Sequence, residues 1–325
     1  MRGGTRATPP QLEVVLICVK RDSAIYLALL FFLLVHDCAA QEQGASQVVA
    51  PQKHPGFAVG VLPALTWKPE YQKFGLVDAA LTGTFVALGV TSRILGPRTN
   101  GPQGGVWVDE GVRNALRASS EQGRARAGAT SDVLVAVSFS YAFVGEPLVN
   151  GAWLRQSPEV GAQIALLNSE VIALTFGVQQ LTANWVARER PYGRECASAE
   201  LPVKSEPCQK SERYRSFFSG HTSLPFSLAA ATCTHNSFLP LNGRQGWVPC
   251  VLGIALAATT GALRIVADNH YATDVFVGAG AGSLIGFLVP FLHYTTGTKA
   301  ALGQGTKLAL RVFPTPQGVQ VLGSF

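Results

Sequence analysis

Six long apolar stretches constrain this chain more than any other feature of its sequence. They cover residues 74–95, 131–149, 160–187, 221–237, 250–267 and 274–293. In most of them Ala, Leu, Val and small residues recur at helical spacing, which predicts a helix for each stretch. Charged residues make up only 14% of the chain, against about 25% in a typical soluble domain. The sequence therefore predicts an all-α bundle of about six helices, either membrane-associated or with a large buried core.

The first forty residues have the pattern of an export signal. Lys20 and Arg21 precede an apolar stretch at residues 24–35, and small residues follow before Gln41. A basic segment, a short apolar core and a small-residue cleavage site define a secretory signal peptide. The apolar core, about 12 residues long, is too short to span a bilayer comfortably. We expect residues 1–40 to be a signal peptide that directs export to the periplasm or envelope, with an uncleaved anchor as the alternative.

Two further regions flank the helical one, which we place at residues 74–295. Residues 41–73 are rich in Gln, Pro and Gly and are interpreted as a linker or extended arm. In the tail, residues 296–325, polar and apolar side chains alternate on either side of a turn at 314–318. This pattern predicts a small C-terminal β-hairpin.

Four cysteines remain once the signal peptide is removed, namely Cys196, Cys208, Cys233 and Cys250. An even number in an exported chain indicates two disulfides. Proximity in the sequence favours Cys196–Cys208 and Cys233–Cys250, and four buried free thiols are the alternative.

Short polar clusters occur beside the ends of the expected helices. Arg190 and Arg264 can each donate paired hydrogen bonds that suit the geometry of a phosphate group. Ser219 and Gly220 directly precede an expected helix, whose free backbone N–H groups and dipole attract an anion. We predict that these four residues bind phosphate.

Two histidines and a carboxylate accompany this phosphate site. His270 and Asp274 are four residues apart and would share one face of a helix. A carboxylate on one ring nitrogen leaves the other nitrogen free to attack. His270 is therefore the predicted nucleophile, Asp274 its orienting partner and His221 the general acid, with a phosphohistidine intermediate. The two nearby arginines argue against a cation at His221, His270 and Asp274, so we expect neither a metal nor a cofactor in the reaction.

The order and spacing of these clusters resemble the type 2 phosphatidic acid phosphatase (PAP2) superfamily. That superfamily also includes bacterial non-specific acid phosphatases and vanadium-dependent haloperoxidases. Its signature has a Lys seven residues before Arg-Pro, then Pro-Ser-Gly-His, then Ser-Arg followed by His and Asp. Here Phe218 replaces the Pro and Leu263 replaces the Ser. The resemblance covers residues 74–295 and implies a bundle of about six helices.

A third departure from the family pattern concerns the phosphate-binding charge. Ala183 occupies the position of the family Lys, two helical turns before Arg190 if the helix continues. Losing one charge-assisted contact would cost on the order of 2–4 kcal/mol of transition-state stabilisation. Arg194 or a lysine of the loop at residues 192–217 is the candidate replacement.

The resemblance implies a metal-independent phosphatase for a phosphate monoester or a lipid or isoprenoid (pyro)phosphate. Reduced activity is expected if nothing replaces the Lys missing at Ala183. Two alternatives are a degenerate phosphate- or lipid-binding protein and a vanadate-dependent haloperoxidase with His270 as the vanadate ligand. The net charge of +6 is scattered, so we expect no nucleic-acid partner, and the oligomeric state is left open.

Membrane topology is the remaining question that the sequence raises. A cleaved signal would place residue 41 outside, so after three spans Arg190 would lie inside, the wrong face for six-helix members of this family. Asp78, Glu170 and His235 would also be expensive in lipid. These points favour an exported globular bundle over a multi-pass membrane protein.

Overall fold

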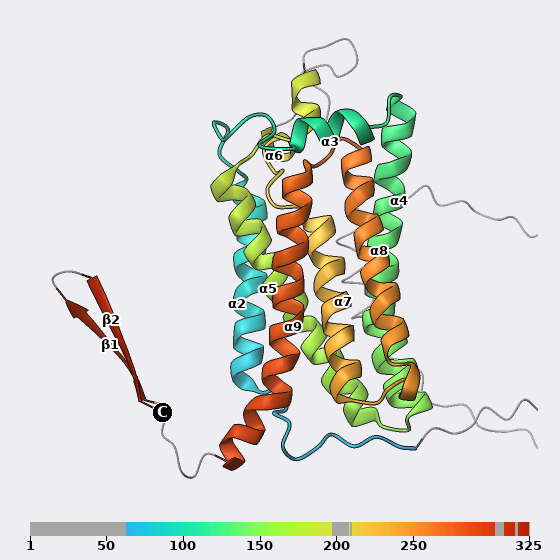
Figure 1. The fold of residues 1–325 in the computed structure, drawn as a ribbon, viewed down its shortest axis with the longest axis vertical. Helices are drawn as coiled ribbons and strands as arrows, with labels where there is room; N and C mark the ends of the chain where they lie inside the picture. Colours follow the sequence, from blue (N-terminus) through green and yellow to red (C-terminus); the bar gives the residue numbers. More distant parts are fainter. Residues whose placement is uncertain (1–62, 197–207, 209, 303–308, 316–317, 325) are drawn as a thin grey trace, which may run out of the picture. The chain divides into compact units, whose positions relative to one another are not determined.

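A computed structural model describes residues 63–196, 208, 210–302, 309–315 and 318–324 (Figure 1). All of them belong to one unit, Val59–Phe325. The expected signal peptide and most of the expected linker lie outside the described residues.

Long helices that run side by side form the fold, as the sequence predicts (Figure 1). The long segments are α2 (Leu76–Leu95), α4 (Glu121–Ser140) with its π-helical continuation η1 (Tyr141–Leu154), α5 (Pro158–Val186), α7 (Gly220–Phe238), α8 (Trp247–Val266) and α9 (Ala272–Leu302). Short helices lie between them: α3 (Asp109–Leu116), η2 (Pro191–Glu195), α6 (Lys210–Arg213) and η4 (Gly243–Gln245). The all-α class is confirmed. The second apolar stretch forms a longer helix than expected, because polar residues 121–130 also join it.

Local sequence signals explain where these helices begin. The Ser120 hydroxyl accepts a hydrogen bond from the backbone N–H of Gly123, which caps α4. Ser157 caps α5 in the same way, and Pro158 occupies the first helical position, where its missing N–H costs nothing. Pro147 lies inside η1, where the missing donor is accommodated by the wider π-helical turns.

Helix α7 runs through the middle of the bundle and is contacted by α4, α5, α8 and α9. Gly278, Gly282 and Gly286 let α9 approach it closely. A Cβ at Gly282 would lie 2.1 Å from the Ser223 carbonyl oxygen, and one at Gly286 would lie 1.9 Å from that of Ser227. Small residues four apart thus permit backbone contact between the two helices. This contact fixes the start of α9 beside the start of α7.

The outer faces of the bundle are strongly apolar. Exposed apolar side chains on α2, for example, include Leu76, Val77, Ile94 and Leu95, and α8 and α9 expose comparable sets. Among the described residues, four helical segments are long and apolar enough to cross a membrane: Glu121–Leu154, Pro158–Glu195, Gly243–Val266 and Ala272–Thr296. The 20 residues of α8 span about 30 Å, the thickness of the hydrocarbon core. Apolar surface of this extent indicates a membrane protein.

The preference for a globular exported bundle therefore needs correction. One of the points in its favour was the cost of polar residues in lipid, and the structure buries all of these residues. Asp78 is 7% exposed, Asn168 1%, Glu170 4% and His235 0%. Since these side chains face the interior, the lipid-facing surface is free of their desolvation cost.

Both expected disulfides are present. Cys196–Cys208 joins two segments of the loop between α5 and α7, and Cys233–Cys250 joins α7 to α8. The chain past α9 includes two antiparallel strands, β1 (Ala309–Thr315) and β2 (Gly318–Ser324), with Ala309 opposite Ser324. The C-terminal β-hairpin as a folded element stays a prediction.

Candidate active site

The predicted site residues come from four places that the fold brings to one end of the bundle. These are the C-terminal end of α5, the start of α7, the end of α8 and the start of α9 (Figure 1). Helix α5 ends at Val186, because Ala187 adopts left-handed backbone angles with φ at 50°. The interpretation of Ala183 and Arg190 as one helical face is thus wrong, since the helix stops between them. The non-helical segment after Ala187 presents Arg188 and Arg190 separately.

His270 is held by a backbone carbonyl. Its Nδ1 lies 2.8 Å from the carbonyl oxygen of Ser216, and the side chain is 2% exposed. A carbonyl only accepts hydrogen bonds, so Nδ1 carries the proton and Nε2 is the unprotonated nitrogen. Burial, followed by the positive charges of Arg190 and Arg264, holds the pKa of His270 well below its usual range. The ring is therefore neutral at physiological pH, as a nucleophile must be.

Asp274 does not contact His270 directly, contrary to expectation. Its Oδ2 lies 4.0 Å from Nδ1 of His270. That oxygen instead accepts hydrogen bonds from the Ser216 hydroxyl, at 2.5 Å, and from the backbone N–H of Tyr271, at 2.9 Å. The reason is that the Ser216 carbonyl already occupies Nδ1. Ser216 thus links the two residues, with its carbonyl on the histidine and its hydroxyl on the carboxylate.

Arg188 holds Asp274 from the other side, a role that sequence reasoning missed. Its Nη1 donates to Oδ1 of Asp274 and its Nη2 to Oδ2 of Asp109, both at 2.7 Å. The guanidinium also lies 4.3 Å from the centre of the Tyr271 ring. Asp109 is 0% exposed and accepts two further bonds from Thr273. The nearness of Arg188 to Arg190 in sequence hinted at this role, whereas nothing in the sequence singled out Asp109.

His221 has a carboxylate partner that the sequence also left unmarked. Its Nε2 lies 3.0 Å from Oδ1 of Asp132, which comes from α4. The same oxygen lies 3.5 Å from Nη1 of Arg264. The charge of Arg264 and then burial lower the pKa of His221 to about 4, and Asp132 opposes that shift. Asp132 therefore orients the predicted general acid.

The two predicted phosphate-binding arginines each keep a donor unused. Nε of Arg190 and Nε of Arg264 are buried and have no hydrogen-bond partner in the part of the chain that the structure describes. A buried donor without an acceptor is costly, so such atoms point to a missing acceptor. Ser219 is the N-cap of α7, and the N–H groups of Gly220 and His221 begin the helix without intrahelical partners. These donors suit an anion.

Arg194, the proposed supplementary cation, is occupied elsewhere. It forms an ion pair with Glu110 and its side chain is 45% exposed. Arg215 is another cation of the loop at residues 192–217, 3% exposed, whose Nη1 donates to Oε1 of Gln180 at 2.7 Å and whose Nη2 donates to the carbonyl oxygen of Arg93 at 3.0 Å. Gln180 is three residues before Ala183 on α5. Burial and the charges of Arg93 and Arg190 lower the pKa of Arg215 to about 10, which leaves it charged at neutral pH.

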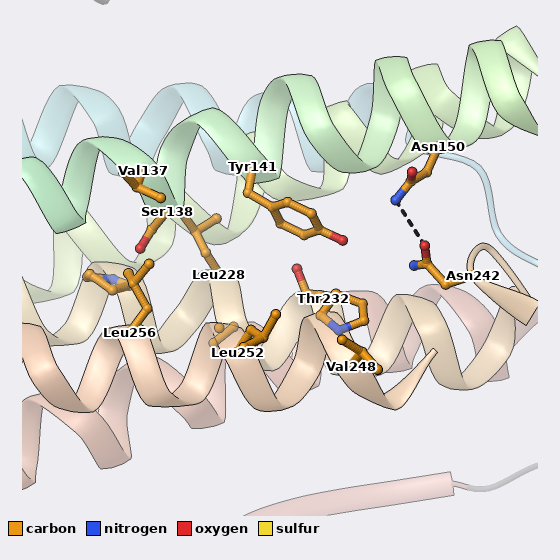
Figure 2. A pocket seen from close by; sticks show the side chains of 14 residues that line it. Val137, Ser138, Tyr141, Asn150, Leu228, Thr232, Asn242, Val248, Leu252 and Leu256 are labelled. Carbon is orange, nitrogen blue, oxygen red and sulfur yellow. Dashed lines mark hydrogen bonds between the residues drawn. The ribbon is translucent and has the colours of Figure 1, made fainter. Parts of the chain in front are cut away.

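An apolar cavity of about 480 Å³ lies between α4, η1, α7 and α8 (Figure 2). Val137, Leu228, Leu252 and Leu256 line one part of it, and Tyr141, Thr232, Asn150 and Asn242 lie toward the other (Figure 2). Pro225 of its lining is four residues after His221 on α7. Pro225 is therefore about one helical turn from His221 along α7.

The family model of the PAP2 superfamily matches residues 165–297. The match includes every site residue predicted from the sequence, while Asp109 and Asp132 lie before it. The resemblance to the PAP2 superfamily is thus confirmed over residues 165–297.

A stretch of 73 residues is 42% identical to the Lipid A 1-phosphatase of Porphyromonas gingivalis. The matched stretch covers 22% of this chain and 15% of the length of that relative. Both comparisons support a phosphatase-type function.

Proposed function

We propose that this protein is a lipid phosphate phosphatase that works through a phosphohistidine. Nε2 of His270 attacks phosphorus, a P–N bond forms, and the P–O bond to the leaving group breaks. His221 gives its proton to the departing oxygen. Water then attacks phosphorus and gives a proton to His221, the P–N bond breaks, and phosphate and free His270 are released.

The observation that carries this proposal is the pair of unused Nε donors on Arg190 and Arg264. Both arginines act electrostatically on His270, so an anion between them would lie beside the nucleophile. The same charges would stabilise the equatorial oxygens of the transferring phosphoryl group. No step in this scheme requires a metal or cofactor.

His221 lacks the proton to donate in the free protein and acquires it when substrate is bound. The charge of Arg264 and then burial lower its pKa to about 4, so it is neutral at pH 7. A bound phosphate adds negative charge that offsets Arg264 and raises the pKa of His221. Substrate binding would then recruit the proton that the leaving group needs.

The apolar cavity supports a lipid rather than a soluble ester as substrate. It shares helix α7 with His221 and lies between helices whose outer faces are apolar. An acyl or isoprenoid chain would fit such a cavity, while its phosphate occupies the polar end of the bundle. The similarity to a Lipid A 1-phosphatase points to the same class.

We also propose that Arg215 compensates for Ala183, so that the chain is an active enzyme. The buried guanidinium contacts α5 one turn before Ala183 and carries charge at neutral pH. The Cys196–Cys208 disulfide, in the loop between α5 and α7, further favours an oxidising compartment such as the periplasm or envelope for the end of the bundle that carries the phosphate site.

The test is phosphate release by the purified full-length protein in detergent. Phosphatidic acid, an isoprenoid pyrophosphate, lipid A and an aryl phosphate are the substrates. His270→Ala should abolish release, and the control Arg194→Gln, at an exposed ion pair, should not. Leu256→Trp, which fills the cavity, should slow lipid substrates much more than the aryl phosphate. Release that survives in His270→Ala would refute the nucleophile assignment.

A further inference from the structure

Three ionisable side chains meet inside the bundle, away from the active site. Asp78 lies in the first turn of α2, Glu170 lies within α5, and His293 lies near the far end of α9. One ligand atom of each lies within 4.8 Å of the others. His293 is 23 residues beyond His270 in the sequence, and most of that interval is helical, so the cluster is about 30 Å from the nucleophile.

Two of these side chains have unused ligand atoms. Oε2 of Glu170 and Nε2 of His293 are buried and have no hydrogen-bond partner among the described residues. Nδ1 of His293 lies 3.0 Å from the carbonyl oxygen of Val289, so it carries the proton and Nε2 presents its lone pair. Nε2 lies 3.5 Å from Oδ2 of Asp78, close to the spacing of two ligands on one ion. The three residues are only 4–7% exposed.

The charge of the cluster is also unbalanced. Within the described part of the chain, no lysine or arginine forms an ion pair with Asp78 or Glu170, and His293 is the basic side chain that lies beside Asp78. Two buried carboxylates without a matching cation are costly in a protein interior. A divalent ion would neutralise both carboxylates, and a neutral His293 would complete the set of donors.

We propose that Asp78, Glu170 and His293 bind a divalent transition-metal ion. One imidazole nitrogen and two carboxylate oxygens are ligands suited to Zn²⁺ or Mn²⁺. The ion would join α2, α5 and α9 at the end of the bundle opposite the phosphate site. Its role is structural, since it lies too far from His270 to take part in phosphoryl transfer.

Metal content and thermal stability test this proposal. The full-length protein, freed of any affinity tag, is dialysed against Zn²⁺ or Mn²⁺, washed, and analysed for bound metal by mass spectrometry. We expect about one ion per chain, and a Tm that rises by about 5–10 °C at saturating metal. EDTA should reverse the rise.

Glu170→Gln and His293→Gln should each weaken metal affinity by about tenfold or more. Glu170→Gln removes a buried charge and keeps the shape of the side chain, so its metal-free form should be no less stable than that of the wild type. The matched control is Glu146→Gln, at a carboxylate that is also fully buried but lies outside the cluster. It should retain the metal and the rise in Tm. A folded wild type that binds no more Zn²⁺ or Mn²⁺ than Glu170→Gln would overturn the proposal.

Discussion

Nδ1 of His270 lies 2.8 Å from the carbonyl oxygen of Ser216, and this contact leaves Nε2 as the nitrogen free to react. Asp274 reaches the histidine only through Ser216, because its own oxygens are taken by the Ser216 hydroxyl, Tyr271 and Arg188. The carboxylate is thus a positioning residue, which holds the segment that in turn holds His270. Because Ser216 lies between the two residues, substitutions of Ser216 and of Asp274 should have different effects on activity and stability.

Ser216→Ala keeps the carbonyl on His270 but removes the hydroxyl bond to Asp274. We expect kcat to fall by about tenfold, which corresponds to the loss of one hydrogen bond to a charged group. We expect little loss of stability. Asp274→Asn should lower both kcat and Tm, because it leaves the buried Arg188 with one carboxylate instead of two. Phosphate release and thermal unfolding measure the two effects. Full activity in Ser216→Ala would show that Asp274 acts without Ser216.

Asp132→Asn tests the assignment of His221 as the acid. Loss of the carboxylate removes the partner at 3.0 Å from Nε2 and lowers the pKa of His221 further. We expect kcat for an alkyl phosphate to fall by about 10²-fold, within the range typical of general acid catalysis. An aryl phosphate, whose leaving group needs no proton, should be affected much less. Equal losses for both substrates would exclude proton donation as the role of this pair.

The pH profile follows from the direction of the His270 pKa shift. Protonation inactivates the nucleophile, and a pKa held well below the ordinary value delays protonation as pH falls. Activity should therefore persist through pH 6.5 and be lost only at more acidic pH. In Arg190→Gln, one depressing charge is gone, so the acid limb of kcat/KM should move to higher pH. The substrate ionises identically in the wild-type and Arg190→Gln measurements, so it cannot cause a difference between them. An acid limb at the same pH in both proteins would contradict the assignment of that limb to His270.

Arg215 and Ala183 form a pair for a rescue experiment. Arg215→Gln should weaken inhibition by inorganic phosphate and lower kcat/KM by about 10²-fold, the effect of one charge-assisted contact. Ala183→Lys alone should bring no gain if Arg215 already supplies the charge. Combined with Arg215→Gln, the lysine should restore part of the activity. Arg213→Gln, at an ion pair with Glu189, is the neighbouring control.

Much of the fold could be predicted from sequence, because long apolar stretches at helical spacing have few structural solutions. The phosphate chemistry stays a prediction, which rests on the order of Arg190, His221, Arg264 and His270 in the sequence. The disulfide pairing was also predictable, because each pair is close in sequence and one bridges adjacent helices.

Only the tertiary structure decided which groups contact these residues. Asp109 and Asp132 are ordinary polar residues in the sequence and join the site because the packing of the helices brings α3 and α4 to it. Direct contact between Asp274 and His270 was a reasonable inference from a spacing of four, yet a loop residue distant in sequence, Ser216, lies between them. The sequence by itself determined the helices and the residue types at their ends, because both depend on local pattern. The hydrogen-bond partners depend on contacts between segments far apart in the chain, which local pattern does not specify.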